Sequence, residues 1–319
     1  MDIGFSRTIK LRAKSACDQA SYDPRKLALI YAGVASGITF LFTVISYFLS
    51  RQIDNTGGIA GLGLRSILST AQSVLPIIST VLIPFWDVGF LRAGMGFARN
   101  EEVRPSTLTA GFRRFGPVLR LLLLRVIIVI GIILIAANVG SMIFSLTPWS
   151  TPLMDIADAI VDAGTFTEEI VADMAPVLLP LYGIFFVIFA VLAIPLFYRL
   201  RMAEFIILDK PAGALAAILF SQRLMRGNCL RLFKLDISFW WFYALSLCSI
   251  AIGYLDVILP FLGITLPISS DTAFFLFYIL HLLSQLALAW WAGSYLQTAY
   301  ATAFDSFIPK AEPTPKQPQ

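Results

Sequence analysis

Residues 211–241 read PAGALAAILFSQRLMRGNCLRLFKLDISFWW. The first half is basic and amphipathic, because an apolar stripe recurs at helical spacing and the arginines lie off it. The stripe is Leu215, Ile218, Leu219 and Met225, and the arginines are Arg223 and Arg226. Gly227 and Asn228 are predicted to end this helix. An apolar run follows, so we expect a helix on the membrane surface that leads directly into a transmembrane helix.

The composition of the whole chain points the same way. The 319 residues are 58% hydrophobic and 14% charged, with a mean hydropathy of +0.79, which is more apolar than soluble domains are. The apolar residues form continuous runs of about twenty or more, the pattern of transmembrane helices rather than of alternating barrel strands. An all-α polytopic membrane protein is therefore predicted.

Six spans are predicted within a single membrane domain, residues 1–307. They lie at about 27–50, 66–98, 117–146, 176–198, 230–259 and 272–303. Residues 5–20 predict a basic amphipathic helix before the first span, and Pro76 and Pro84 predict a kink or break in the second. The Pro-rich tail, 308–319, is expected to be disordered.

The lysines and arginines predict the orientation. With six spans, 22 of the 24 fall on one side of the membrane, and only Arg51 and Arg65 fall on the other. The positive-inside rule places the richer side in the cytoplasm, together with both termini. We expect a multi-pass protein of the bacterial cytoplasmic membrane.

A second surface helix is predicted to begin at Pro105. Leu108, Phe112 and Phe115 would share one face, while Arg113 and Arg114 point away and Gly116 ends the helix. Residues 116–124 (GPVLRLLLL) also resemble residues 227–235 (GNCLRLFKL), which indicates a duplicated unit or a chance similarity of Leu-rich helix starts. The residues expected at headgroup level are Arg113, Arg114, Arg120, Arg223, Arg226, Arg231, Lys234 and Asp236.

Three segments carry a family resemblance. They are Ser221–Trp241, whose pattern includes Leu224-Met225, Gly227, Arg231, Phe233, Leu235-Asp236 and Ser238-Phe239, then Gly111–Gly116 (GFRRFG), and Tyr300–Phe304 (YATAF). This pattern resembles an uncharacterised bacterial integral-membrane family, domain of unknown function 975. The resemblance implies a six-span bundle in the bacterial inner membrane and brings no activity or site residue. The chain departs from the pattern after Phe304, where Asp305 replaces the expected tyrosine.

Four polar residues within the predicted spans form a candidate membrane site, since ionisable groups at that depth are costly. Asp87 is either part of a buried ion pair, with Arg92 or Arg125, or an ion or substrate contact. Arg125 is expected to pair with a carboxylate such as Asp87 or Glu204. His281, the only histidine, is either packed across a helix interface or part of a proton relay. Gln285 follows it by four residues and shares its face.

The sequence holds no catalytic motif. HExxH, GxSxG, a Walker A loop and the dinucleotide fingerprint are all missing from it. The three cysteines are scattered and no second histidine exists, so neither a metal site nor a cofactor is predicted. The acidic segment 147–175 is expected to expose a solvated face or to bind Ca²⁺ weakly.

Two classes of function remain after an intramembrane enzyme is set aside. The first is a non-enzymatic interaction or accessory protein whose basic helices engage anionic lipid headgroups or a protein partner, including a second copy of itself. The second is a transporter or lipid-handling protein with a polar site at the membrane midplane. Nucleic acid is not an expected partner. His281→Ala is expected to leave folding and membrane insertion intact.

Overall fold

The computed structural model describes residues 3–55, 62–153, 155–156, 168–264 and 266–308. Within these ranges every regular element is a helix, which confirms the predicted all-α class. Five helices are long and apolar enough to cross a membrane, and a bent helix pair raises that number to six if it forms one span. The predicted tail lies outside the described residues, apart from Ile308.

The chain divides into two compact units. Unit 1 comprises Met1–Val118, Glu204–Ala212 and Leu230–Gln319, and unit 2 comprises Leu119–Ala203 and Gly213–Cys229. The described helices of unit 1 are α1 (Ile3–Asp18), α2 (Pro24–Asn55), α3 (Leu62–Ala98), η2 (Pro105–Thr109), α4 (Ala110–Arg113), α8 (Ala203–Asp209), α10 (Cys229–Ile237), α11 (Trp240–Gly253), α12 (Leu255–Phe261), α13 (Ser270–Leu288), η3 (Ala289–Gly293) and α14 (Ser294–Phe307). Unit 2 holds most of α5 (Phe115–Ser145), with α7 (Glu168–Leu200) and α9 (Ala214–Met225).

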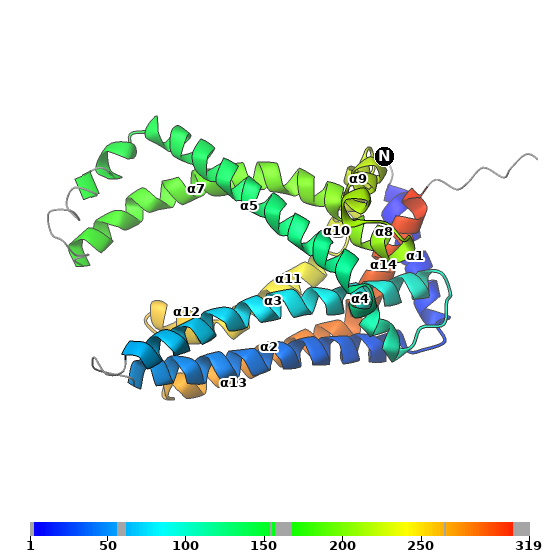
Figure 1. Cartoon of the computed structure of the whole chain (residues 1–319), viewed down its shortest axis with the longest axis horizontal. Helices are drawn as coiled ribbons and strands as arrows, with labels where there is room; N and C mark the ends of the chain where they lie inside the picture. Colours follow the sequence, from blue (N-terminus) through cyan, green and yellow to red (C-terminus); the bar gives the residue numbers. More distant parts are fainter. Residues whose placement is uncertain (1–2, 56–61, 154, 157–167, 265, 309–319) are drawn as a thin grey trace, which may run out of the picture. The chain divides into compact units, whose positions relative to one another are not determined.

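The long helices of unit 1 have the surface of membrane spans. Helices α2, α3 and α13 run side by side (Figure 1). Many of their apolar side chains are exposed, such as Phe48 at 59% and Ile67 at 67%, as expected for helices surrounded by lipid. Helix α3 continues through Pro76 and Pro84, so these prolines do not break it. Prolines are tolerated in such helices because neighbouring groups satisfy the freed carbonyls.

The buried core of unit 1 lies at one end of these helices. We call it the packed end: α1, η2, α4, α8, α10, α14 and residues 85–98 of α3. Ala13, Phe97, Ala299 and Phe304 are each at most 2% exposed there. Gly89 makes the close packing possible, because a Cβ at this position would lie 1.7 Å from the Leu108 carbonyl oxygen.

The stretch at 211–241 departs from its prediction. Helix α9 ends at Met225 and Gly227 takes a φ of +81°, as expected. The chain then forms α10, and a bend of 62° separates α10 from α11. The predicted straight span 230–259 is therefore divided among α10, α11 and α12, and α10 with α11 is long and apolar enough to cross a membrane as one bent pair. Leu232 and Leu235 cause the difference, because both are fully buried in the packed end.

The predicted last span, 272–303, lies within the segment Ser270–Phe307, which is long and apolar enough to cross a membrane. Helix α13 ends at Leu288, a π-helical turn (η3) follows, and α14 completes the segment. Ala299, Ala303 and Phe304 are buried on α14, which packs against α1 and α3. The final third of the segment therefore belongs to the packed end, because its small residues allow close helix contact.

The helix predicted from Pro105 is shorter than expected. Pro105 begins a 3₁₀ helix (η2), α4 follows, and Gly116 lies inside α5 rather than ending a helix. Leu108 is fully buried, whereas the rings of Phe112 and Phe115 stack against Phe85 with half of their surface exposed. The glycines of the two similar segments therefore differ, since Gly116 is helical and Gly227 ends α9.

Unit 2 is a smaller assembly. Phe144 of α5, Val177 of α7 and Ile156 form a buried apolar cluster. At the other end of α7, the Ser221 hydroxyl of α9 donates to the Arg199 carbonyl at 2.7 Å. In the acidic segment 147–175, Asp155 is exposed, while residues 157–167, which include Asp158 and Asp162, lie outside the described residues. The predicted solvated face or Ca²⁺ site there remains a prediction.

Candidate functional site

A hollow of about 370 Å³ in unit 1 contains two of the four predicted polar residues. It lies among α2, α3, α11 and α13, and it extends along η3 to the start of α14. Its polar lining includes Tyr31, His281, Gln285 and Gln297. The rest of the lining is mainly apolar, and such a mixture is typical of sites that bind amphipathic or small organic molecules.

Asp87 is connected to this hollow through Tyr31. The Tyr31 hydroxyl donates to Asp87 Oδ1 at 2.5 Å, and the Tyr31 ring stacks on Phe90 with 4.2 Å between centroids. Trp86 Nε1 donates to the Tyr31 carbonyl at 3.1 Å, which holds α2 against α3. The nearby Arg92 binds Glu101 at 2.6 Å rather than Asp87. The hydrogen-bond donor to Asp87 is thus Tyr31, whereas the sequence predicted an ion pair with Arg92 or Arg125.

His281 joins α13 to α11 through Ser249. The His281 Nδ1 atom lies 2.8 Å from the Ser249 carbonyl oxygen, so Nδ1 carries the hydrogen and Nε2 is the basic nitrogen. Gln285 Nε2 donates to the Ser249 hydroxyl at 3.1 Å, and the Ser249 and Ser284 hydroxyls also bond. The contact is close, because a Cβ on Gly253 would lie 3.2 Å from His281 Cβ. The ring is therefore both packed and at the edge of the hollow.

Arg125 belongs to unit 2 and is described within it. Its Nη2 atom donates to the Leu200 carbonyl, at the end of α7, with a distance of 3.1 Å. Cations are favoured at helix C-termini because the last carbonyls have no intrahelical donor. The structure thus joins His281, Gln285, Tyr31 and Asp87 in one neighbourhood of unit 1 and gives Arg125 a role at the end of α7.

Most residues predicted at headgroup level are accessible. The exposed ones are Arg113, Arg120, Arg223, Arg226 and Arg231, and Lys234 is half-buried. Arg114 is an exception, because its guanidinium donates to the carbonyls of Ile207 and Lys210 in the packed end. Arg114 was predicted to point away from the apolar face of its helix, and the structure directs its guanidinium to the end of α8 instead of to open surface. The backbone carbonyls that end α8 attract it inward.

Asp236 is an acceptor inside the packed end. The Tyr300 hydroxyl donates to Asp236 Oδ1 at 2.5 Å, and the Tyr243 and Tyr300 hydroxyls lie 2.5 Å apart. This chain of hydrogen bonds connects α10, α11 and α14. Tyr300 lies in the segment Tyr300–Phe304 and Asp236 in the segment Ser221–Trp241. Both segments carry the family resemblance, but nothing in the pattern indicated this contact.

Arg99 is a functional-site candidate that sequence reasoning missed. Its guanidinium binds Asp209 at 2.5 Å and Asp305 at 2.6 Å, which ties the end of α3 to α8 and α14. Hydrogen bonds to Asp305 and Asp209 raise the pKa of Arg99 further above its ordinary value, so the guanidinium stays charged. Asp305 is the position that departs from the resembling family, and that departure was the available signal.

The described side chains offer no metal-binding group of three or more His, Cys, Asp or Glu residues. Cys17, Cys229 and Cys248 are free thiols.

Comparisons with known proteins were made on the whole chain. Neither a search of curated proteins nor a search of solved structures found a match. A family described as "Protein of unknown function (DUF975)" matches residues 8–302. This match covers most of the chain, including all but the last residues of the helices that are able to span a membrane, and the chain therefore belongs to the DUF975 family.

Proposed function

We propose that this protein is a non-enzymatic, six-span protein of the cytoplasmic membrane, bacterial as its family resemblance implies, whose basic helices engage anionic lipid headgroups on the cytoplasmic side. In this proposal both termini are cytoplasmic, and α10 with α11 forms the sixth, bent span. The headgroup contacts organise the surrounding membrane or a protein partner, and no chemical step is assigned to the protein.

The observation that carries the proposal is the two-sided character of α1. Ile9, Ala13 and Ala16 are buried against the rest of the packed end. The opposite face exposes Arg7 and Arg12. A helix with one buried face keeps its basic face directed outward, where it meets the anionic lipid of an adjacent leaflet.

The opposite end of unit 1 supports the orientation. Arg51, one of the two basic residues predicted outside, forms an ion pair with Asp271 at the start of α13. Its charge is therefore balanced, whereas α1 and the start of α2 expose several cations without carboxylate partners among the described residues. The asymmetry of unpaired positive charge agrees with a cytoplasmic packed end.

Retention of anionic lipid tests the proposal. The combined variant Arg7→Gln, Arg12→Gln and Lys26→Gln is purified beside the wild type in mild detergent, and phosphatidylglycerol binding is measured by native mass spectrometry. Each cation near an anionic surface contributes about 1 kcal/mol, so three are expected to weaken binding by about two orders of magnitude. Unchanged phosphatidylglycerol binding would contradict the proposal.

The orientation has its own test. Cysteines at exposed Gln19 and exposed Ser269 are placed in a variant whose native cysteines are serine. An impermeant maleimide is expected to label position 269 in intact cells with a permeable outer envelope, and position 19 only after the cytoplasmic membrane is opened. Labelling of both positions from one side would refute the six-span topology.

A transporter or lipid-handling function is the second candidate, and the hollow beside His281 favours it. Its lining by Tyr31, His281 and Gln285 places polar groups among spanning helices. Proteoliposomes with fluorescent lipid and an internal pH dye test this candidate. Lipid exchange between leaflets or proton flux that His281→Asn reduces would support transport, and a tight, unchanged membrane would favour the first proposal.

A further inference from the structure

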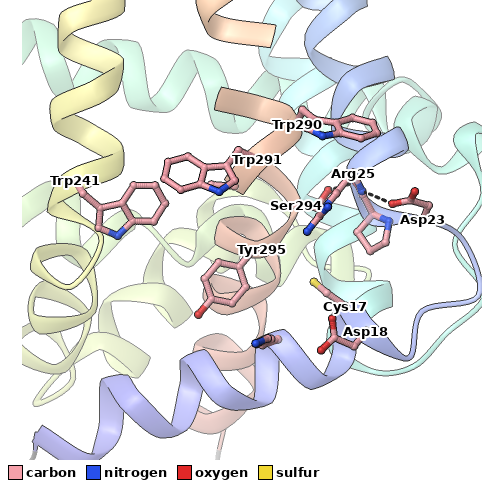
Figure 2. A pocket seen from close by; sticks show the side chains of 12 residues that line it. Cys17, Asp18, Asp23, Arg25, Trp241, Trp290, Trp291, Ser294 and Tyr295 are labelled. Carbon is pink, nitrogen blue, oxygen red and sulfur yellow. Dashed lines mark hydrogen bonds between the residues drawn. The ribbon is translucent and has the colours of Figure 1, made fainter. Parts of the chain in front are cut away.

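A pocket of about 540 Å³ in unit 1 lies between α1, the start of α2 and the η3 turn. Three tryptophans and one tyrosine form its wall, and Lys14 and Arg25 lie at its edge. Figure 2 shows the rings of Trp241, Trp291 and Trp290 along one side and α1, with Cys17 and Asp18, along the other. Neither the hollow beside His281 nor the predicted headgroup residues account for this pocket.

The aromatic wall is built from two distant segments. Trp241 lies in the first turn of α11 and Trp291 in the π-helical η3 turn, and their ring centroids are 4.8 Å apart. A π-helical turn inserts an extra residue into a helix, and such turns are frequent at functional sites. Trp291 remains 61% exposed although it adjoins the packed end. The protein thus holds an open aromatic surface at this point.

The depth of Trp290 and Trp291 in the membrane indicates which part of the bilayer this aromatic surface contacts. From Ser270 to Trp290 the helix rises by about 30 Å, which is the thickness of the hydrocarbon core. With Ser270 at one boundary, Trp290 and Trp291 reach the headgroup level of the other leaflet. Pro24, the first residue of helix α2, also lines this pocket. Tryptophan favours this level because its ring is amphipathic.

The charges of the pocket have both signs. The cations are Lys14 and Arg25, and neither side chain has an ion-pair partner among the described residues. The carboxylates are Asp18, one helical turn after Lys14, and Asp23, whose Oδ1 accepts the Arg25 backbone N–H at 2.9 Å. Two cations fit one phosphate, whereas two carboxylates and open tryptophan faces fit an ammonium group. A purely anionic headgroup would meet the carboxylates unfavourably.

We infer that this pocket binds the headgroup of an amine-bearing glycerophospholipid. Its phosphate lies against Lys14 and Arg25, and its ammonium group lies among Asp18, Asp23 and the indole faces. The inference rests on the proposed membrane placement and goes beyond it, because the exposed cations of α1 attract any anionic lipid while the pocket selects one headgroup class.

The experiment uses the full chain in mild detergent and native mass spectrometry, with phosphatidylethanolamine and phosphatidylglycerol added separately. Trp291→Ala, Lys14→Gln and Arg25→Gln change the pocket. Their matched controls are Trp240→Ala, Arg65→Gln and Arg104→Gln, which change exposed residues outside the pocket lining. We expect one tightly retained phosphatidylethanolamine per wild-type chain, and about a tenfold loss of its binding in each pocket variant and none in the controls.

Several outcomes would overturn the inference. These are equal retention of the two lipids by the wild type, an equal loss in pocket and control variants, or binding of soluble glycerophosphoethanolamine as tight as that of the lipid, which would indicate a soluble ligand. Trp291 is exposed, so its truncation spares the core, and unchanged thermal unfolding verifies folding of each variant. The Arg7, Arg12 and Lys26 variant leaves the pocket intact, so failure of the proposed function and failure of this inference are distinguishable.

Discussion

Arg99 and Asp305 form a bidentate ion pair that joins the end of α3 to the last helix. Arg99 Nη2 lies 2.6 Å from Asp305 Oδ1, and Arg99 Nε lies 3.1 Å from Oδ2. The remaining terminal nitrogen binds Asp209. Each of the three guanidinium nitrogens is thus hydrogen-bonded to a carboxylate. The two aspartates come from segments far from Arg99 in the chain, so Arg99 positions three elements of the packed end at once.

Arg99→Ala is expected to lower the free energy of unfolding by about 1–3 kcal/mol, because two carboxylates lose charged donors. Thermal unfolding in detergent, followed by size-exclusion chromatography, measures the effect. Arg104→Ala is the matched control, since the Arg104–Glu102 pair is 70% and 65% exposed and such pairs contribute about 0–1 kcal/mol. Equal melting temperatures for the two variants would contradict the role of Arg99.

Gly89→Ala is expected to prevent normal assembly of the packed end. A Cβ there would lie 1.7 Å from the Leu108 carbonyl oxygen, and the backbone of η2 cannot retreat without losing its packing. The expected result is loss of the monodisperse peak in size-exclusion chromatography. Gly33→Ala is the control, because open space surrounds that position and alanine favours a helix. A wild-type profile for Gly89→Ala would disprove the contact between α3 and η2.

Tyr300→Phe is expected to cost about 1.5–3 kcal/mol of stability, because the Asp236 carboxylate loses a donor at 2.5 Å. Tyr243→Phe removes only the outer hydroxyl of the same chain and is expected to cost less, about 0.5–1.5 kcal/mol. Melting temperatures of the two variants measure the difference. A larger loss for Tyr243→Phe would show that the order of the hydrogen bonds is different.

His281→Ala is expected to insert into the membrane normally and to unfold at a lower temperature. Insertion depends on hydropathy, whereas stability depends on the Nδ1 bond to the Ser249 carbonyl. His281→Asn places an amide nitrogen near the Nδ1 position and is expected to recover most of the loss. Membrane fractionation and thermal unfolding separate the two effects. Loss of His281→Ala from the membrane fraction would assign the residue to folding alone.

Cys17 is expected to react slowly with a soluble maleimide at neutral pH. Burial raises the pKa of the Cys17 thiol, so the reactive thiolate is scarcer than in an exposed cysteine. Its reaction rate therefore continues to rise with pH above the ordinary thiol range. The control is Ser15→Cys, at an exposed position on the same helix, in a variant whose native cysteines are serine. Equal rates for the two positions at pH 7 would contradict the burial.

Long-range structure was only partly predictable from the residues. The hydropathy of α2, α5 and α7 identified them as candidate spans, because a lipid-facing helix is predominantly apolar whatever its neighbours are. The candidate site was less predictable. His281 and Gln285 were identified because polar residues are rare in such helices, but Tyr31 and Ser249, which bond to the site, are common residues in spans and gave no signal.

The sequence by itself determined the all-α class of the protein and the long apolar helices that are able to span a membrane, since these depend on local composition and the length of apolar runs. Only the tertiary structure decided where the stretch at 211–241 bends and which residues of the last predicted span are buried in protein. Leu232, Leu235 and the small residues of α14 are as apolar as lipid-facing residues, so hydropathy cannot distinguish burial in protein from burial in lipid. Whether an apolar residue is buried in protein or in lipid depends on which helices pack together at the packed end. The contacts of Arg99, Asp305 and Tyr300 hold these helices together.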